Sequence, residues 1–346
     1  MENKAKISIR DIAEKAGVSK SLVALALNDR YGVNSETRLH ILHVAHQMGY
    51  DFTRIRKQHK SGRAILSILV DKQTHMTETF WREIFWGIER AANEKNVLLD
   101  IITYEDYNNR VEINKMVSHI LHSETHGIIV VFRCNKNMLD EFLQFSLPII
   151  LVEPQEIYDL RYTHIRGSYY NGAYEVADYL IRQGHKHLAF VGNLKHCISF
   201  RLRYHGFKDR ISQEEGIRFS EIVENSTGND LYDKEVDKEC FLRVINSPDR
   251  PTAVFFANDP LAIQYFDIFK ELNLSVPEDI SVVGFDNDRE SALCMPKLTT
   301  CQIEAREIGR QAIEAMLEKI EGCNYQKIIE VSTRFVERES VKNLNK

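Results

Sequence analysis

The stretch that decides the fold of this chain runs from Ser8 to Asn28 and reads Ser-Ile-Arg-Asp-Ile-Ala-Glu-Lys-Ala-Gly-Val-Ser-Lys-Ser-Leu-Val-Ala-Leu-Ala-Leu-Asn. Its apolar residues recur at helical spacing in two short sets, one before Gly17 and one after Ser19. Gly17 can adopt a positive φ and end the first helix, and Ser19 can cap the second through its side-chain oxygen. The stretch therefore predicts two short helices joined by a sharp turn.

A third helix is expected after this pair. Residues 29–32 favour a turn, Asn34 and Ser35 can cap a new helix, and Gly49 can end it. Residues 1–50 are thus expected to form one small all-helical head. Two helices joined by such a turn typically place the second one in the major groove of DNA, which indicates a nucleic-acid partner.

The motifs Asp11-Ile12-Ala13, Ala16-Gly17-Val18-Ser19 and Leu27-Asn28, together with Val23, resemble the DNA-binding head of the lactose-repressor (LacI/GalR) family. Any amphipathic helix pair could show the apolar positions, but the turn residues favour the resemblance. It implies that Lys20, Ser21 and Leu25 read base edges, although Leu25 could instead only pack within the head. The other head residues implied at the DNA interface are Ser8, Arg10, Ser19 and Asn28.

Residues 51–62 are polar and basic, cannot form a core, and are expected to be a hinge or linker. In the resembled family this segment forms a short helix on operator DNA, where a leucine wedges into a base step of the minor groove. Here Phe52-Thr53 departs from the usual start, and His59 stands at the leucine position. Arg56, Lys57 and His59 are expected to contact the minor groove as basic groups, with weaker DNA kinking.

Charge is divided unevenly along the chain. Residues 1–62 contain 11 Lys and Arg against 6 Asp and Glu, a net charge of +5. Because the net charge of the whole chain is −5, the remaining residues carry −10. A basic head on an acidic body suits a module that binds DNA phosphates, although such a surface could also be merely solvated.

The composition is that of an ordinary globular protein. At 346 residues, with 43% hydrophobic and 27% charged residues, the chain is expected to form two or three domains. It has no apolar run long enough to cross a bilayer and begins Met-Glu-Asn-Lys without a signal sequence, so a cytoplasmic location is expected. Its six scattered cysteines lack zinc-site spacing and are expected to be reduced thiols, with no metal and no cofactor.

From residue 64 onward, apolar strands alternate with helical stretches. The run 127–132 is continuously apolar, as is typical of a parallel strand covered by helices on both faces. The alternation occurs twice, which predicts an α/β body with two such sheets. The expected elements are 64–70, 80–94, 98–104, 110–122, 127–132 and 149–152 in the first set, and 170–183, 187–191, 204–214, 253–257, 263–272, 281–285 and 304–320 in the second.

This body resembles the regulatory part of the same family, a doubly wound, two-lobed fold of the periplasmic-binding-protein type (type I). The motifs that carry this resemblance include Gly184-His185, Gly206-Phe207, Gly284-Phe285-Asp286 and Leu298-Thr299-Thr300. It implies an effector-binding and dimerisation body of residues 63–346 whose lobes exchange strands. Lobe one is expected to span about 63–163 plus 292–323, and lobe two about 164–291 plus 324–346.

The resemblance also places a small-molecule effector between the lobes, where strand carboxyl ends meet. Arg203 and Asp286 could orient the polar groups of a ligand beside an aromatic wall, or could form a lobe-bridging or surface ion pair. The aromatic residues could instead belong to the core, and Arg133 and Glu153 could be solvated loop charges. The implied effector-binding residues are Phe80, Trp81, Arg133, Glu153, Ser199, Arg203, Asn258, Asp259 and Asp286.

Two positions depart from the family pattern in this region. Ser168-Tyr169 stands where an Asp-Asn pair is expected, and Cys197 stands where an arginine is common. The predicted pocket is therefore less charged on that side.

The sequence as a whole predicts a homodimeric DNA-binding transcriptional regulator, and a repressor is the expected kind. It is expected to bind a two-fold operator and to respond to an effector that is a sugar or sugar derivative. A solute-binding receptor or transport component on the same lobes is the alternative, which the basic head opposes. An enzyme is not expected, because the sequence lacks a nucleophile elbow, a Walker loop and a Gly-x-Gly-x-x-Gly turn. Whether the effector strengthens or weakens DNA binding is left open, and no added tail helix supports a tetramer.

Overall fold

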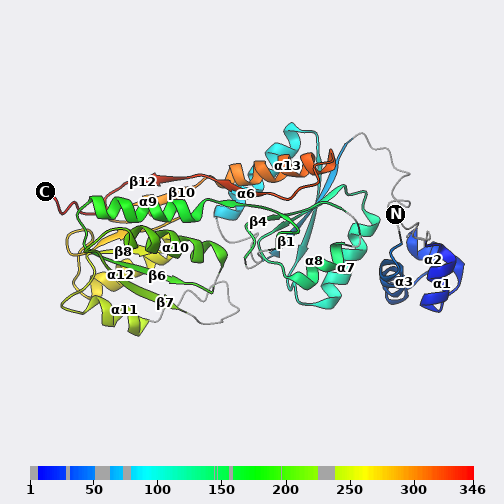
Figure 1. Cartoon of the computed structure of the whole chain (residues 1–346), viewed down its shortest axis with the longest axis horizontal. Coiled ribbons are helices and arrows are strands. Elements are labelled where there is room, and N and C mark those ends of the chain that lie inside the picture. Colours follow the sequence, from blue (N-terminus) through cyan, green and yellow to red (C-terminus); the bar gives the residue numbers. More distant parts are fainter. Residues whose placement is uncertain are drawn as a thin grey trace.

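The computed structural model describes residues 7–28, 32–50, 63–72, 79–143, 145, 147–155, 159–195, 197–224 and 238–346. A small helical head and two α/β lobes follow one another along the long axis of the molecule (Figure 1). This arrangement confirms the predicted fold class of a helix-turn-helix head and a doubly wound body. The predicted linker contacts Arg56, Lys57 and His59 lie outside the described residues.

The head consists of α1 (Ile9–Ala16), α2 (Lys20–Leu27) and α3 (Ser35–Gln47). Its apolar residues point inward from all three helices because none of the helices could bury its face alone. The side chains that form this small core include Ile12, Ala13, Val23, Ala26, Leu27, Ile41, Leu42 and Ala45.

Local capping fixes the turn between α1 and α2. Ser8 and Asp11 form a reciprocal capping box at the start of α1, in which the Ser8 amide donates to the Asp11 carboxylate at 2.8 Å. Gly17 ends α1 with a φ of 67°, and the Ser19 hydroxyl accepts a hydrogen bond from the Leu22 amide at 3.1 Å. The predicted turn chemistry is therefore confirmed at both residues.

The first lobe is built on a six-stranded parallel sheet in the order β11-β5-β4-β3-β1-β2. Alternate residues of its strands face opposite helical layers, since side chains alternate across a strand. Ile129 and Val131 share a cluster with α6 and α13, whereas Ile128 and Val130 pack with α7 and α8. The elements are β1 (Ile65–Asp71), α6 (Thr79–Glu94), β2 (Leu98–Tyr104), α7 (Arg110–His122), β3 (Gly127–Val131), α8 (Lys136–Leu143), β4 (Ile149–Val152), β5 (Thr163–Gly167), α13 (Ala305–Ile320) and β11 (Ile328–Val331).

The second lobe is built on a four-stranded parallel sheet in the order β7-β6-β8-β9. Helices α9 and α10 cover one face, and α11 and α12 cover the other. The elements are α9 (Tyr169–Arg182), β6 (His187–Asn193), α10 (Ile198–Ser212), β7 (Arg218–Glu224), α11 (Lys238–Ile245), β8 (Ala253–Phe256), α12 (Asp259–Glu271), β9 (Ser281–Val283), the short 3-10 helix η1 (Arg289–Ala292), β10 (Thr300–Ile303) and β12 (Thr333–Val336).

The strands that pass between the lobes correct the expected boundaries. β5 and β11, which contain residues 164–167 and 328–331, had been expected in the second lobe but pair in the sheet of the first. Conversely, residues 292–303 are expected in the first lobe but lie in the second. The carbonyls of Thr299 and Cys301 accept hydrogen bonds from the amides of Gly284 and Asp286, which follow the second-lobe strand β9. The physical reason is that β5 would otherwise expose an unpaired edge, and β11 supplies its partner.

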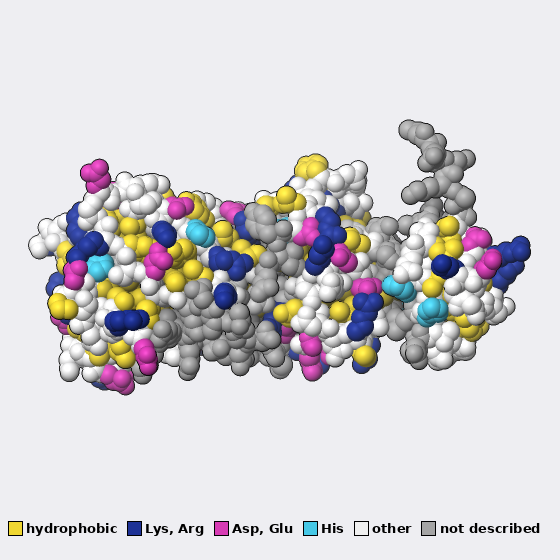
Figure 2. All heavy atoms as spheres, turned by 60° about the horizontal axis from the view of Figure 1, so that its bottom comes forward, with side chains coloured by type: hydrophobic (Ala, Val, Ile, Leu, Met, Phe, Trp, Pro, Cys, Tyr) yellow, Lys and Arg dark blue, Asp and Glu magenta, His cyan; other side chains and the backbone are white. Residues whose placement is uncertain are grey.

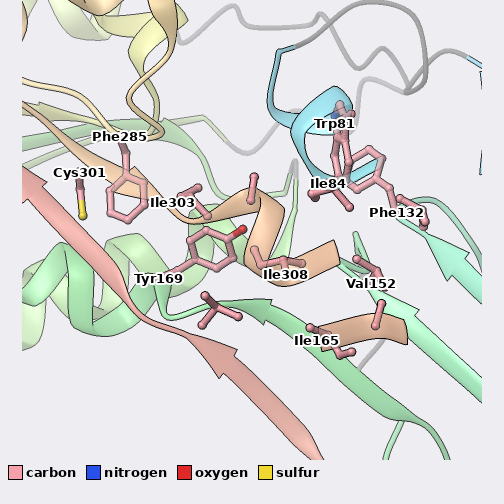
Figure 3. Close-up of a cluster of buried hydrophobic side chains, with 14 of the residues drawn as sticks. Trp81, Ile84, Phe132, Val152, Ile165, Tyr169, Phe285, Cys301, Ile303 and Ile308 are labelled. Atoms are coloured by element: carbon pink, nitrogen blue, oxygen red, sulfur yellow. The ribbon is translucent and has the colours of Figure 1, made fainter. Parts of the chain in front are cut away.

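A single apolar cluster continues from one lobe into the other. Figure 3 shows Tyr169 lying between Phe285 of the second lobe and Ile308 of α13, with Val152 and Ile165 of the first-lobe sheet close by. The lobes are therefore joined by packed side chains as well as by the chain segments that cross between them.

Candidate DNA-binding and effector sites

The first turn of α2 presents the predicted base-reading residues to solvent. Lys20 and Ser21 are exposed, whereas Leu25 is half-buried and therefore contributes to packing as well as to the surface. The Arg10 side chain on α1 is exposed as well. In Figure 2, Lys and Arg side chains lie at the outer end of the head beside acidic side chains, and the face of the lobes in view also carries both signs of charge.

Three of the implied DNA contacts are also helix caps. The side-chain oxygens of Ser8 and Ser19 cap α1 and α2, and the Asn28 side chain donates to the Ala24 carbonyl at 2.8 Å. All three residues are exposed at helix ends. These three side chains therefore stabilise the ends of the two helices.

In the first lobe, Arg133 follows β3 at the carboxyl end of the sheet. Its guanidinium lies 3.5 Å from the fully buried Asp71 carboxylate, donates to the Gln155 side chain, and lies over the Tyr107 ring. Because Arg133 is itself buried, the alternative of a solvated loop charge is excluded for it. Arg133 is held in place at the point where the first lobe meets the second.

In the second lobe, Arg203 of α10 and Asp286 after β9 form a close ion pair. The Nη2 to Oδ1 distance is 2.7 Å, and Nη1 donates to the Ala257 carbonyl. The guanidinium is stacked 4.1 Å from the Phe285 ring centroid. Burial lowers the pKa of Arg203, but Asp286, Tyr169 and Cys197 together outweigh it and the pKa is raised. Within the described residues, the buried Nε of Arg203 has no hydrogen-bond partner. This N–H group can therefore donate to a ligand.

The two lobes touch at Glu153, which follows β4. Gly167 donates its amide to the Glu153 carboxylate at 2.7 Å. Burial raises the pKa of Glu153 to about 7, against the opposing effects of the Tyr169 side chain, the Gly167 amide, Arg203 and Arg166. A direct bond from the Ile198 amide of α10 to the Gln155 carbonyl, 2.8 Å long, closes the contact. We call this region the lobe junction: Arg133, Glu153, Gln155, Tyr169, Ile198, Arg203 and Asp286.

The remaining predicted effector residues are less available. Trp81 is buried and packs 4.6 Å from the Phe132 ring, so it realises the core alternative, whereas Phe80 beside it is only half-buried. Ser199 is half-buried in the first turn of α10, with its hydroxyl 2.9 Å from the Cys197 sulfur.

Asn258 and Asp259 hold the second lobe together. The Asn258 side chain caps α12, and the fully buried Asp259 carboxylate accepts from the Thr300 hydroxyl at 2.6 Å and from the Asp288 amide at 2.9 Å. Burial raises the pKa of Asp259 to about 7. Both side chains are thus engaged within their own lobe.

Sequence reasoning missed Asp71, Gln155 and Tyr169 as members or partners of the lobe junction. The signal for Asp71 was available, since a carboxylate that ends an otherwise apolar strand needs a buried partner. Nothing in the spacing of Gln155 or Tyr169 indicated a contact, because their partners come from distant parts of the chain.

Two known family models match this chain, one over the head and one over the α/β body. Residues 8–51 match a family model described as "Bacterial regulatory proteins, lacI family", and residues 177–341 match one described as "Periplasmic binding protein-like domain". This chain belongs to the LacI family. It is a DNA-binding transcriptional repressor with a periplasmic-binding-protein-like effector domain, and LacI-family regulators are not enzymes.

Relatives and solved structures of LacI-family proteins align over nearly the whole chain. The HTH-type transcriptional repressor PurR of Histophilus somni (strain 2336) is 28% identical over 97% of this chain and 99% of its own. The PurR of Pasteurella multocida (strain Pm70) is 26% identical over the same shares. A complex of the transcriptional regulator CelR with cellobiose has a TM-score of 0.66 at 18% identity, covering 97% of this chain and 100% of that one. The lac repressor dimer bound to operator and the anti-inducer ONPF has a TM-score of 0.65 at 21% identity, covering 98% and 100%.

Two negative findings apply to the described part of this LacI-family chain. No helix there is long and apolar enough to span a membrane, and no group of three or more His, Cys, Asp or Glu side chains could hold a metal ion.

Proposed function

We propose that the lobe junction of this repressor binds a small-molecule effector, which controls how the head binds operator DNA. The observation that carries the proposal is the buried Arg203–Asp286 pair, which has a spare Nε donor and lies against the ring of Tyr169, two residues after the first-lobe strand β5. A ligand that contacts both lobes at this point stabilises one relative arrangement of the lobes over others. That arrangement in turn determines how the head binds operator DNA.

The effector is best described as a neutral polyhydroxylated compound, such as a sugar or sugar derivative. Arg133 and Arg203 each face a carboxylate in their own lobe, so the junction offers paired donors and acceptors rather than an excess of positive charge. Half-buried Phe80 packs against Trp81, whose ring contacts Phe132 next to Arg133, and adds apolar surface on this side. Structures of the same fold include a complex of the transcriptional regulator CelR with cellobiose and a LacI family transcriptional regulator from Enterococcus faecium with bound ribose, and both support a carbohydrate.

The repressor acts as a homodimer on a two-fold operator in the cytoplasm. An apolar groove of about 490 Å³ runs beside the edge strand β2 and is lined by Phe85, Trp86, Leu98 and Ile101, among others. Trp86 and Ile101 are each 53% exposed, and Met295 at the far lobe is 81% exposed. A second copy of the chain is the occupant that suits apolar surface on both lobes, because a dimer places two heads on two half-sites. The dimeric lac repressor on its operator supports this arrangement.

The test begins with a thermal-shift screen of cellobiose, ribose, other neutral sugars and free nucleobases on the full chain. The affinity of any stabilising compound is then measured by calorimetry for the wild type, Arg203→Ala and Asp286→Ala. Both variants should lose most of the affinity while still binding operator DNA in the absence of the compound.

Arg210→Ala is the matched control, since Arg210 lies on the same helix but pairs with Asp178 and Glu214. Wild-type affinity in both junction variants would remove the effector site from this region. Stabilisation by nucleobases but by no sugar would overturn the carbohydrate assignment alone.

A further inference from the structure

The head lies against the first lobe through its third helix. In Figure 1, α3 is the helix of the head nearest α7 of the first lobe. A hollow of about 190 Å³ lies between the two parts, and side chains of both line it. The lining residues are His40, Leu42 and His43 of α3, Arg110, Asn114 and Val117 of α7, and Glu141 of α8.

Beside this hollow, an apolar side chain joins the two parts. Leu121 lies one turn beyond Val117 on α7, is half-buried, and packs against the apolar cluster of the head. It also packs against the core of the first lobe. The α7 residues at this contact, Arg110, Asn114, Val117 and Leu121, recur at helical spacing, so a single face of α7 meets the head.

The lobe's side of the contact is held in shape by its own ion pair. The Arg110 guanidinium of α7 lies 2.8 Å from the Glu141 carboxylate of α8. This pair ties together the two helices that line the hollow on the side of the lobe. The head therefore meets a surface whose shape is set by the lobe itself.

The contact leaves the base-reading helix available to DNA. Lys20 and Ser21 in the first turn of α2 are exposed, and α2 contributes no residue to the lining of the hollow. A head that is docked through α3 can thus still present α2 to a major groove. Docking and DNA binding are compatible.

We infer that the contact between α3 and α7 fixes the position of the head on the first lobe, and thereby determines the spacing of the two half-sites that the dimer binds. The inference rests on the proposed homodimer on a two-fold operator and adds to it the surface that holds each head. The segment between head and lobe is the 12 residues 51–62. An unstructured peptide of that length has an average end-to-end distance of about 20 Å.

A tether of that reach could not by itself discriminate between half-site spacings. Two inserted base pairs move one half-site by about 7 Å and turn it by roughly 70° relative to the other. A docked head cannot follow this change, whereas a head held by a flexible tether can. Discrimination between spacings therefore reports whether the head is docked.

The experiment measures the affinity of the effector-free, full-length chain for operator DNA selected from random sequence, and for the same DNA with two base pairs inserted between the half-sites. The wild type should lose about 100-fold in affinity on insertion, because both heads can no longer bind at once. In Leu121→Asp, which places a carboxylate against the apolar cluster of the head, the loss should be less than about 3-fold. This variant should also bind the original operator more weakly, since its heads are ordered only on binding.

A second variant and a control guard against a folding defect. Asn114→Arg places a cation in the hollow beside Arg110 without altering an apolar residue of the lobe core, and it should lose spacing discrimination in the same way. Val111→Asp is the matched control, because Val111 lies on the same helix, is 61% exposed and does not line the hollow. It should keep the wild-type discrimination. All four proteins should bind a duplex with a single half-site equally, which shows that the head is folded.

Wild-type discrimination in both contact variants would overturn the inference and leave the proposed dimer in place. Tighter binding of every spacing by these variants would also overturn it, because the contact would then hold the head away from DNA. Equal binding of both spacings by the wild type would count against the two-fold operator itself, and the positioning role would fail with it.

Discussion

The Arg203–Asp286 pair provides the sharpest test of the energetics at the lobe junction. Arg203 is 3% exposed and Asp286 15%, so removal of the carboxylate leaves a guanidinium in the protein interior without its counter-charge. We expect Asp286→Ala to lower the free energy of unfolding by about 3 kcal/mol. Arg203→Met keeps the apolar stem and removes the charge. It should cost about 2 kcal/mol, because the partly exposed Asp286 can be hydrated.

The double variant distinguishes a coupled pair from two independent residues. Once both charges are gone, no unpaired charge is left inside, so the double variant should cost about 3 kcal/mol rather than the sum of the two, a coupling of about 2 kcal/mol. The assay is urea unfolding followed by circular dichroism, with midpoints and slopes compared among the four proteins. The Arg210–Asp178 pair on the same helix is less buried and should show a coupling below about 1 kcal/mol. Additive costs at Arg203 and Asp286 would refute the reasoning.

Three further changes have defined outcomes. Since burial raises the pKa of Glu153 to about 7, the stability it contributes is present below its ordinary pKa and is lost as the pH rises through 7. The free energy of unfolding, measured by urea titration, should therefore decrease less between about pH 5 and pH 8 in Glu153→Gln than in the wild type. An equal decrease in both proteins would exclude Glu153 as a titrating group. Ile101→Asp places a charge in the exposed groove beside β2 and should turn the dimer into a monomer by sedimentation equilibrium, whereas a dimer of unchanged affinity would exclude this face. Ser19→Ala removes the cap of α2 and should destabilise the head by about 1 kcal/mol in thermal unfolding, with unaltered melting as the contrary result.

Much of the fold could be predicted because its local signals are strong. Gly17 and Ser19 determine the turn of the head by backbone conformation and capping, and continuous apolar runs such as β3 are diagnostic of strands covered on both faces. β7 and α8 were not predicted, since β7 is an edge strand with charged residues and α8 is only two turns long. The predicted lobe boundary between residues 323 and 324 was wrong, because the chain changes lobe only after β11. β11 and β12 are separated only by Ser332 yet pair in different sheets, which no local pattern indicates.

The site was less predictable than the fold. Arg203 and Asp286 could be selected from motifs, and the structure brings them together. The engagement of Asp259 by Thr300 depends on the strand that returns beside β9, which no local pattern reveals. Tyr169 was visible only as a departure from the family pattern, since its contact with Arg203 of α10 depends on the geometry of the crossing between lobes.

The central claim is that a ligand at the lobe junction and DNA at the head influence each other. The most direct measurement is the affinity of the ligand from the thermal-shift screen for the full chain, with and without operator DNA selected from random sequence. Thermodynamic linkage requires the ligand's affinity to change by the same factor as the DNA affinity changes when ligand is added, a change of about 5-fold to 150-fold in typical allosteric proteins. The account predicts this reciprocal change, and its loss in Arg203→Ala. An equal ligand affinity with and without operator would contradict it.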